Sequence, residues 1–558
     1  MAESAGEIGF DIPEFSVEIP KNRECGDYAS NIAMVLVCQT TKNTPMEIAE
    51  ELVSKIKYGS ISDTFKKIEI VSPGFINFFL SKDYLKEEIR NVLKEKESYG
   101  SSDKGKGKTM LIDYSGVNIA KPFGIGHLRS TIIGQAIYNL HKFLGYNVIG
   151  DNHIGDWGTQ FGKLIYAIKN WGYKKKVSEY SVKSLVELYV KFHEEAEEDP
   201  DLEREARNWF KKLEEGDAEA RKIWKECVKI SLKEFDRIYK FLGVKIDLTL
   251  GESFYEKMLP GVIEEAIKKG IAANSEGAVI IPFPDDVLPP LLIQKSDGAT
   301  LYSTRDLATI KYRIKRFKPS KIIYEVGAEQ SLYFKQLFWA SELFGWGKRE
   351  DYVHVAHGLM RLKTGKMSTR RGEIIFLEDV LAEATKKAEK IIEEKNPNLK
   401  DVEKTAKAIG IGAVKYNGLS GHPTGDIVFD WSKALNLQGN SGPYLQYAYA
   451  RARNILKKDR RRADVGKKNF ENEMEIRLAK KIQEFPFVVE KAAYSYSPNL
   501  ICSYLFELSK EFNSFYESVP VLKSEGDIAG LRLALIKATS QVIKNGLGLL
   551  GISVLENM

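Results

Sequence analysis

The chain has 558 residues, of which 43% are hydrophobic and 29% are charged. These proportions are ordinary for a globular protein, and at roughly 150 residues per domain this length predicts three or four domains. No window approaches the roughly 20 uninterrupted apolar residues of a membrane-spanning helix, and the N-terminus has no basic region followed by an apolar run. We therefore expect a cytoplasmic protein with no membrane partner.

Charge and cysteine content exclude little by themselves. The net charge of +6 is small for so long a chain, so it permits a polyanionic partner without demonstrating one. Basic runs at 174–176 and 457–462 fit a solvated helix face as well as contact with nucleic acid. No two of the four cysteines form a Cys-x-x-Cys pair, so neither a zinc knuckle nor a redox pair is indicated. We predict no dedicated metal site in the protein.

Residues 1–105 are predicted to form a small α+β domain. Helical patterns cover residues 27–39 and 45–57, and strand-like runs cover residues 67–71 and 75–80. The glycine-rich, charged segment 100–108 has no apolar side chain, so we predict a linker there.

Residues 106–377 alternate between short apolar runs and helical patterns. Strands are expected at 109–114, 146–150, 321–326 and 352–356, and helices at 128–144, 157–171 and 330–344. This alternation predicts an α/β fold with a doubly wound, Rossmann-type parallel sheet. The highly charged helical stretch near 178–242 is predicted to be an insertion in this domain.

Residues 378–558 have helical periodicity in nearly every segment. The clearest cases are residues 409–417, 442–456, 475–494, 501–519 and 529–549. We therefore predict an all-helical C-terminal domain.

The loop between the first strand and the first helix of the α/β domain is the most informative segment. Gly124 and Gly126 let the backbone approach a ligand, and the helix that follows offers free N–H groups and the positive end of its dipole. His127 can donate to a phosphate and Lys121 adds a mobile cation. These features suit a nucleoside triphosphate, although a tight turn with incidental polar residues is the alternative.

Residues 118–131, Asn-Ile-Ala-Lys-Pro-Phe-Gly-Ile-Gly-His-Leu-Arg-Ser-Thr, resemble the HIGH signature of class I aminoacyl-tRNA synthetases, in the form typical of arginyl-tRNA synthetases. Gly124 replaces the first histidine of that signature, which in the family helps to hold the ATP phosphates. The resemblance implies that Gly124, Gly126 and His127 bind ATP. It also implies that His127 and Lys121 act in catalysis, with Lys121 compensating for the missing histidine.

A second loop, residues 365–372, is bounded by glycines and strongly cationic. A basic surface loop of this kind is common, but this one resembles the KMSKS loop of class I synthetases and follows the first signature in the correct order. Lys366, Met367 and Ser368 match, and Thr369 stands in place of the second lysine. The resemblance implies that these three matching residues bind ATP and that Lys366 is catalytic.

Four polar side chains are candidates for binding an amino acid. A guanidinium is planar and permanently charged, so carboxylates beside a hydroxyl group match it best. Tyr302 and Asp306 are four residues apart and share one face if a helix begins there. Glu252 and Gln330 are further candidates, although each of the four, taken singly, also fits an ordinary surface or capping residue.

The resemblance to arginyl-tRNA synthetases assigns roles to these residues. It implies that Glu252, Tyr302 and Asp306 recognise the guanidinium, and that Asn118 and Gln330 hold the main chain of arginine. Residues 151–162 also resemble a signature of the family. His153 within them either lines the site or is a structural, hydrogen-bonded histidine.

The helical pattern at 442–453 is rich in tyrosine and arginine. Such side chains can stack on unpaired bases, or they can pack within their own helical bundle. The sequence Gly-Pro-Tyr-Leu-Gln-Tyr-Ala-Tyr-Ala-Arg resembles the anticodon-binding domain of arginyl enzymes, and residues 545–558 resemble that family's last segment. The resemblance implies tRNA contacts for Tyr444, Gln446, Tyr447, Arg453 and Met558.

Together these features predict a class I arginyl-tRNA synthetase with three domains: a tRNA-contacting domain (1–105), a catalytic domain (106–377) and an anticodon-binding domain (378–558). The expected reaction attaches L-arginine to tRNA(Arg) through an arginyl-adenylate and releases AMP and pyrophosphate. Mg2+ is expected to enter with ATP, and the chain is expected to be a monomer. Two rival hypotheses are a tRNA-binding protein without catalysis, favoured only by Gly124, and a nucleotidylyl transferase acting on a small molecule, against which the helical domain argues.

Overall fold

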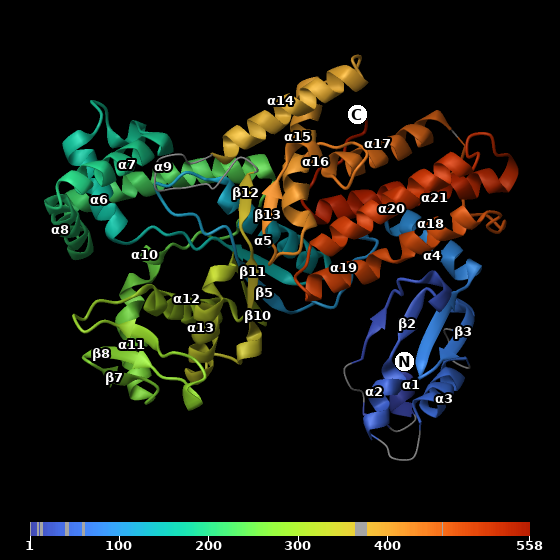
Figure 1. Cartoon of the computed structure of the whole chain (residues 1–558), viewed down its shortest axis with the longest axis horizontal. Coiled ribbons are helices and arrows are strands. Elements are labelled where there is room, and N and C mark those ends of the chain that lie inside the picture. Colours follow the sequence, from blue (N-terminus) through green and yellow to red (C-terminus); the bar gives the residue numbers. More distant parts are fainter. Residues whose placement is uncertain are drawn as a thin grey trace. The chain divides into compact units, whose positions relative to one another are not determined.

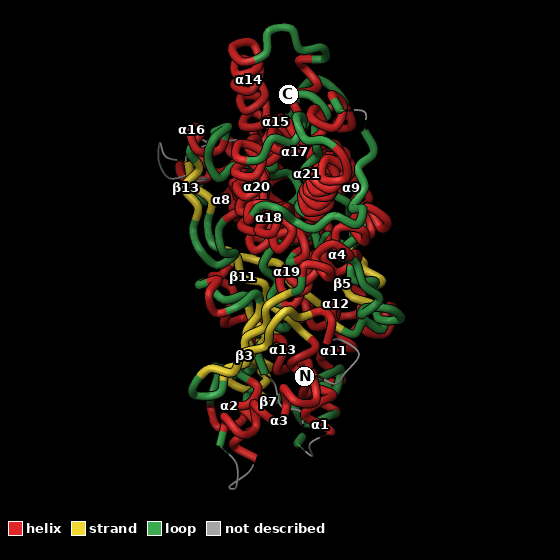
Figure 2. The backbone as a smooth tube through the Cα atoms, turned by 90° about the vertical axis from the view of Figure 1, so that its right-hand side faces the viewer, coloured by secondary structure: helices red, strands yellow, loops and turns green. Residues whose placement is uncertain are grey.

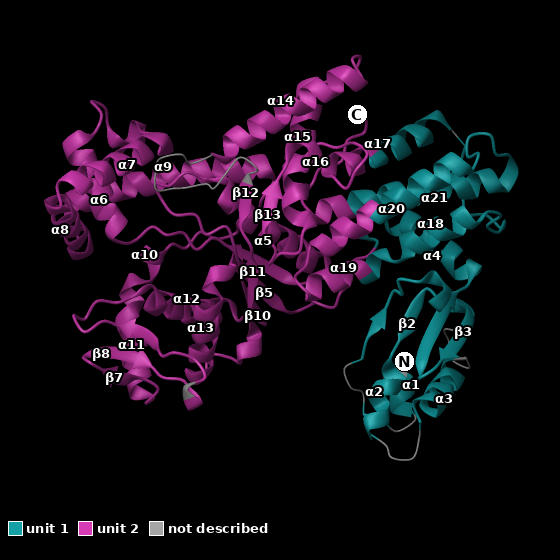
Figure 3. Ribbon diagram, viewed as in Figure 1, with its two compact units in different colours: residues 1–99, 448–487, 507–545 teal, residues 100–447, 488–506, 546–558 magenta. Residues whose placement is uncertain are grey.

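The computed structural model describes residues 2–7, 10–11, 15–39, 44–57, 62–362, 376–459 and 461–558. They fall into two compact units (Figure 3). Unit 1 comprises residues 1–99, 448–487 and 507–545, and unit 2 comprises residues 100–447, 488–506 and 546–558. None of the helices in these ranges is long and apolar enough to cross a bilayer.

An antiparallel sheet of four strands, in the order β1-β2-β4-β3, organises the N-terminal part of unit 1. Its elements are β1 (Val17–Glu18), β2 (Tyr28–Ser30), β3 (Phe65–Val71), β4 (Phe75–Leu80), α1 (Ala2–Glu7), α2 (Ile32–Leu36), α3 (Pro45–Lys57) and α4 (Lys82–Glu95). Helices α2 and α3 pack with β4 around the fully buried side chains of Ile32, Leu52 and Ile76. The hydrophobic effect of this burial holds the small α+β fold together.

The predicted helix over residues 27–39 is wrong at its start. Strand β2 occupies residues 28–30, where Tyr28 pairs with Phe78 and Ser30 with Ile76 of β4. A pairing with a distant strand overrides the local helical pattern, because strand preference is decided by neighbours across the sheet.

Helices from the other end of the chain complete unit 1. Its helix α18 (Glu473–Gln483) packs on α4, and Lys480 of α18 forms an ion pair of 2.8 Å with Asp27. The helix predicted over 475–494 is in fact two helices, α18 and α19 (Phe485–Tyr494). Pro486 explains the break, because proline lacks the N–H that would continue the hydrogen bonds of α18.

Unit 2 contains the predicted parallel sheet, with the strand order β11-β10-β5-β6. Its strands are β5 (Thr109–Asp113), β6 (Asn147–Asp151), β10 (Lys321–Gly327) and β11 (Tyr352–His357), and its helices are α5 (Ile125–Phe143), α6 (Thr159–Trp171), α12 (Tyr302–Phe317) and α13 (Ser331–Leu343) (Figure 1). All four strands end at one edge of the sheet, where Asp113 of β5 pairs with Asp151 of β6. Ligands of open parallel sheets bind at this edge.

The predicted insertion consists of three helices, α7 (Val182–Glu198), α8 (Asp201–Glu215) and α9 (Ala218–Leu242), which lie together with α6 (Figure 1). The next segment adds α10 (Glu252–Tyr255), α11 (Leu259–Lys268), β7 (Ala273–Ser275), β8 (Ala278–Ile281) and β9 (Leu291–Gln294). These three strands form a small antiparallel sheet that the sequence did not predict. Strands of three or four residues are too short for a readable alternation of apolar and polar side chains.

The last part of the chain is helical, as predicted (Figure 2). Its elements are β12 (Met360–Leu362), α14 (Leu377–Lys395), α15 (Val402–Ser420), β13 (Ile427–Phe429), α16 (Trp431–Ala434), α17 (Gly442–Lys458), α20 (Asn499–Ser518) and α21 (Gly526–Leu549), besides α18 and α19. Strands β12 and β13 pair in parallel, and no other strand occurs in the described residues after Leu377.

The four cysteines divide between the two units. Cys25 and Cys38, in unit 1, are exposed, whereas Cys227 and Cys502, in unit 2, are buried. Burial raises the pKa of the Cys227 thiol to about 12 and also raises the pKa of Cys502. The two buried thiols therefore stay protonated and unreactive near neutral pH.

Candidate functional site

The loop that joins β5 to α5 is bent sharply at the carboxyl edge of the sheet. Ser115 and Ala120 have φ values of 77° and 57°, a region that non-glycine residues adopt only where the surroundings impose it. The Ile119 N–H donates to the Gly155 carbonyl at 3.1 Å, next to an isolated bridge between Asn118 and Gly155. A Cβ at Gly155 would lie 1.9 Å from Oδ1 of Asn118, so only glycine there lets the Asn118 side chain keep its position.

The N-terminus of α5 presents His127 in a defined tautomer. The Gly124 N–H donates to Nδ1 of His127 at 3.2 Å, so Nδ1 is the acceptor and Nε2 carries the proton of the neutral ring. Burial and the charge of Lys121 lower the pKa of His127 to about 4. Near neutral pH the ring is therefore an uncharged donor at the positive end of a helix dipole, which suits contact with a phosphate.

The backbone conformation at position 124 does not require glycine. Its φ of −88° and ψ of 169° are extended values that any residue adopts. The substitution of the signature histidine therefore removes a side chain without changing the path of the loop.

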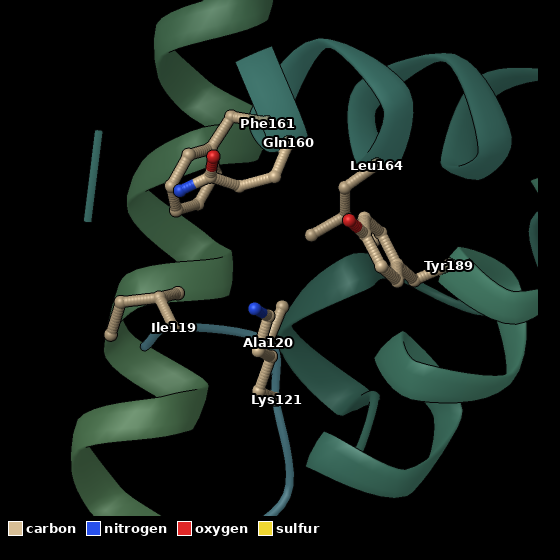
Figure 4. Close-up of a pocket in the computed structure, with 7 residues that line it drawn as sticks. All are labelled: Ile119, Ala120, Lys121, Gln160, Phe161, Leu164 and Tyr189. Atoms are coloured by element: carbon tan, nitrogen blue, oxygen red, sulfur yellow. The ribbon is translucent and has the colours of Figure 1, made fainter. Parts of the chain in front are cut away.

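Lys121 lines a small cavity with Gln160 of α6 and Tyr189 of α7 (Figure 4). The cavity measures about 10 Å³, which is room for one water molecule and not for a nucleotide. The Lys121 side chain is exposed, and its charge acts on both His127 and His193. It is thus a cation between the start of α5 and the helical insertion.

A second group of side chains, here named the acidic cluster, comprises Glu252, Asp306, Asp156 and His153. Glu252 is the first residue of α10, and its N–H donates to the Ile154 carbonyl at 3.1 Å. Asp306 lies on α12, accepts a hydrogen bond from the Tyr333 hydroxyl at Oδ2, and has its Oδ1 3.8 Å from Nε2 of His153. The loop after β6, α10 and α12 thus bring separate parts of the sequence together.

Burial raises the pKa values of Glu252 and Asp306 in the acidic cluster. It raises the pKa of Glu252 to about 7, against the opposing charges of His153 and Arg305. Burial also raises the pKa of Asp306, against His153 and the Tyr333 hydrogen bond. Carboxylates held in this way gain most from a buried, permanently charged cation such as a guanidinium.

Tyr302, the first residue of α12, adjoins the acidic cluster. Its ring lies edge to face with that of Tyr333 at 4.9 Å between centroids, and its side chain is exposed. Helix α12 begins at Tyr302, as the prediction required, so Tyr302 and Asp306 lie four residues apart on one face of the helix. Gln330, exposed at the start of α13, follows the carboxyl end of β10.

A buried ion pair lies farther along the same helix. Arg313 of α12 is not exposed, and its Nη2 donates to Asp113 at 2.7 Å and to Asp151 at 2.8 Å. Since Asp113 and Asp151 end β5 and β6, this pair fixes α12 to the sheet edge. The sequence reasoning missed Arg313, because nothing in a helix with several other cations marks one arginine as buried.

The loop carrying Lys366, Met367 and Ser368 lies outside the described residues, but both of its neighbours are placed beside the start of α5. Before the loop, Arg129 of α5 is fully buried and donates to the carbonyls of Gly358 and Gly425 next to β12 and β13. After it, the Leu377 N–H donates to the Phe123 carbonyl at 2.9 Å. In the sequence, Arg129 is recognisable only as part of the signature at residues 118–131. Nothing there indicates that it is buried and binds these two carbonyls.

The predicted tRNA-binding residues lie in different surroundings. Tyr447 is 42% exposed, whereas Tyr444 is buried. Arg453, on the part of α17 that belongs to unit 1, is partly buried. The carbonyl of Met558 accepts a hydrogen bond of 3.3 Å from Asn396.

Gln446, also a predicted tRNA contact, is buried in unit 2. Gln446 is not exposed, and its amide group donates to the carbonyls of Ala408 at 3.2 Å and Ser553 at 2.8 Å. A buried amide that holds two backbone segments together stabilises the fold.

Three family models match most of the chain. Residues 88–431 match the model described as tRNA synthetases class I (R), catalytic domain. Residues 445–558 match the DALR anticodon binding domain, and residues 2–80 match the arginyl tRNA synthetase N terminal domain.

Similar proteins agree with these models. An arginine–tRNA ligase of Clostridium botulinum (strain Loch Maree / Type A3) is 45% identical over 99% of this chain and 97% of its own. One of Halothermothrix orenii is 42% identical over 100% and 98%. The crystal structure of arginyl-tRNA synthetase from Plasmodium falciparum superposes with a TM-score of 0.83 at 26% identity, over 100% of this chain and 97% of that one. The Thermus thermophilus arginyl-tRNA synthetase shares the fold, with a TM-score of 0.86 at 24% identity over 100% of this chain and 98% of that one.

The class I catalytic model spans more than half of the sequence, and full-length relatives are more than 40% identical. The chain belongs to the arginyl-tRNA synthetases, the arginine–tRNA ligases of class I.

Proposed function

We propose that this enzyme joins L-arginine to tRNA(Arg) at the carboxyl edge of the parallel sheet in unit 2, through an arginyl-adenylate. The observation that carries this proposal is the pair of buried carboxylates in the acidic cluster, Glu252 on α10 and Asp306 on α12, which suit a guanidinium. The same unit contains the start of α5, the proposed phosphate-binding element. The three proposed domains are those expected from the sequence: residues 1–105, 106–377 and 378–558.

In the first step the arginine carboxylate attacks the α-phosphorus of ATP, so that an oxygen–phosphorus bond forms and the bond to pyrophosphate breaks. The protein supplies no nucleophile, and its contribution is positioning and charge stabilisation. The N–H groups at the start of α5 and the Nε2–H of His127 would donate to phosphate oxygens, a role supported by the hydrogen bond that Nδ1 of His127 accepts from Gly124. Lys121 and Lys366 add positive charge as pyrophosphate leaves.

Mg2+ enters this scheme as part of the ATP substrate. No cluster of three or more His, Cys, Asp or Glu side chains among the described residues is arranged to hold a metal ion. We propose that the metal binds the phosphates, where it would neutralise charge that Gly124, Gly126, Met367 and Ser368 would surround.

Arginine is proposed to bind with its guanidinium against Glu252, Tyr302 and Asp306, and with its main chain against Asn118 and Gln330. The fork of N–H donors on arginine satisfies planar carboxylates in pairs, which a lysine ammonium cannot do. A wrong amino acid would leave buried carboxylates unpaired, so this recognition is selective without a separate editing step.

In the second step the terminal ribose hydroxyl of tRNA takes the arginyl group and AMP leaves. Tyr447 and Arg453 are proposed as tRNA contacts because one is an exposed ring and the other a cation. Tyr444, Gln446 and Met558 remain proposed contacts from the family pattern. We propose that the enzyme works in the cytoplasm as a monomer.

The test is the charging of radiolabelled arginine onto total tRNA with Mg-ATP, with lysine and glutamine as matched controls. Arginine-specific charging is expected. Binding of tRNA without any charging would contradict the proposal. The missing signature histidine at Gly124 would then be the first candidate cause of the lost catalysis.

A further inference from the structure

His153 is held so that one ring nitrogen lies near the carboxylate of Asp306. Its Nδ1 lies 3.0 Å from the Leu250 carbonyl. A carbonyl oxygen can only accept, so Nδ1 carries the proton of the neutral ring and Nε2 carries a lone pair. That lone pair faces Asp306, whose Oδ1 is 3.8 Å from Nε2.

The two facing atoms are both free to accept. At 3.8 Å, with no proton on Nε2, they form no hydrogen bond with each other. Oδ2 of Asp306 already accepts from the Tyr333 hydroxyl, which leaves Oδ1 for another donor. Both side chains are partly buried, His153 at 15% and Asp306 at 25% exposure, so a donor between them would be largely withdrawn from water.

The chemistry of the surrounding groups favours a cation with several N–H bonds. Glu252, the first residue of α10, and Asp306 of α12 supply the two carboxylates of this group. A guanidinium offers five N–H donors in a plane, and two bidentate pairs with two carboxylates use four of them. A neutral acceptor beside Asp306 gives the remaining donor a partner.

We propose that His153 is a specificity-determining residue, whose Nε2 accepts an N–H of the substrate guanidinium beside Oδ1 of Asp306. The proposal rests on the proposed function and adds a third acceptor to the recognition of arginine. It decides between the two roles that the sequence left open, a side chain that lines the site and a purely structural histidine. The hydrogen bond to Leu250 then serves to select the tautomer.

Two amide variants separate these roles, because each retains one half of the imidazole. In His153→Gln the side-chain amide reaches the place of Nε2, and in His153→Asn it reaches only the place of Nδ1 and retains a donor to Leu250. If Nε2 contacts arginine, His153→Asn raises the arginine KM about ten-fold or more, and His153→Gln stays within about three-fold of the wild type. The ATP KM and kcat of both variants remain near wild type.

The reverse order, with His153→Gln impaired and His153→Asn normal, overturns the proposal and shows that the ring acts only through Leu250. An equal arginine KM in both variants overturns it as well. Asp306→Ala, measured beside them, keeps the outcomes distinguishable. If the wild type does not charge arginine, or Asp306→Ala leaves the arginine KM unchanged, the proposed function or its binding residues fail, and the role of His153 fails with them.

Discussion

Unit 2 contains two pairs of carboxylates at the end of its parallel sheet, and they differ in what neutralises them. Asp113 and Asp151 hold the buried guanidinium of Arg313 at 2.7 and 2.8 Å. Glu252 and Asp306 have no such partner in the described part of the chain, apart from His153 at 3.8 Å from Asp306. Helix α12 serves both pairs, because Asp306 and Arg313 are two turns apart on one face.

The difference shows that pairing of carboxylates with a guanidinium can either stabilise the fold or bind a substrate. In the first pair the cation is part of the chain, so folding alone satisfies the carboxylates. In the second pair burial raises the pKa of Glu252 to about 7 and raises that of Asp306, so ionisation responds to a cation that arrives later. The first pair should therefore govern stability, and the second should govern the affinity for arginine.

The largest effect on this comparison is expected from Arg313→Met. The variant leaves Asp113 and Asp151 buried without a counter-charge, which should lower the free energy of unfolding of unit 2 by about 3–5 kcal/mol. Urea unfolding monitored by tryptophan fluorescence measures the change.

Arg237→Met is the matched control for this variant. Arg237 pairs with Glu234 and Glu378, but its side chain is 49% exposed, so its loss should cost at most about 1 kcal/mol. If the two variants lose equal stability, the buried ion pair of Arg313 contributes no more to the free energy of unfolding than the exposed pair of Arg237.

Asp306→Ala should act on binding instead. It removes a charge-assisted pair worth about 1.5–3 kcal/mol, so the arginine KM should rise at least about ten-fold while the ATP KM stays constant. Steady-state charging kinetics measure both constants. Glu265→Ala, which removes a carboxylate paired with Lys269 and Lys311, should leave the arginine KM unchanged. An unchanged value in Asp306→Ala would exclude this residue from the binding site.

The smallest effect is a pH dependence of arginine binding. The pKa of Glu252 is raised above its ordinary value to about 7, so the carboxylate is ionised above that pH and becomes neutral below it. Since a guanidinium binds the ionised form, the apparent affinity for arginine should be complete near pH 8 and fall about ten-fold by pH 6. Glu252→Gln should bind more weakly at pH 8 and lose this dependence. A wild-type KM that does not change over the interval contradicts the assignment.

The parallel sheet could be predicted because its strands are short apolar runs that alternate with helices. The common face of Tyr302 and Asp306 could be predicted from their spacing. The small sheet β7–β9 could not, because its strands are too short to show a period. The error at residues 27–39 has a different cause, since the partner of β2 is a strand far along the sequence.

Parts of the site depend on contacts that have no local signature. Arg313 is neighboured in sequence by Lys311, Lys315 and Arg316, and its burial is decided by Asp151, 162 residues earlier. Gln446 belongs to a helix with aromatic and basic residues, yet the carbonyls of Ala408 and Ser553 draw it into the interior. A family pattern identifies such residues without stating which of them face a ligand.

The placement of the thiols has a practical consequence for following this enzyme in solution. A maleimide dye added near neutral pH would react with Cys25 and Cys38 and leave Cys227 and Cys502 untouched. The native chain would then carry fluorophores on unit 1 alone, without any substitution. Energy transfer from such a dye to a labelled tRNA would test the proposed contact of tRNA with unit 1.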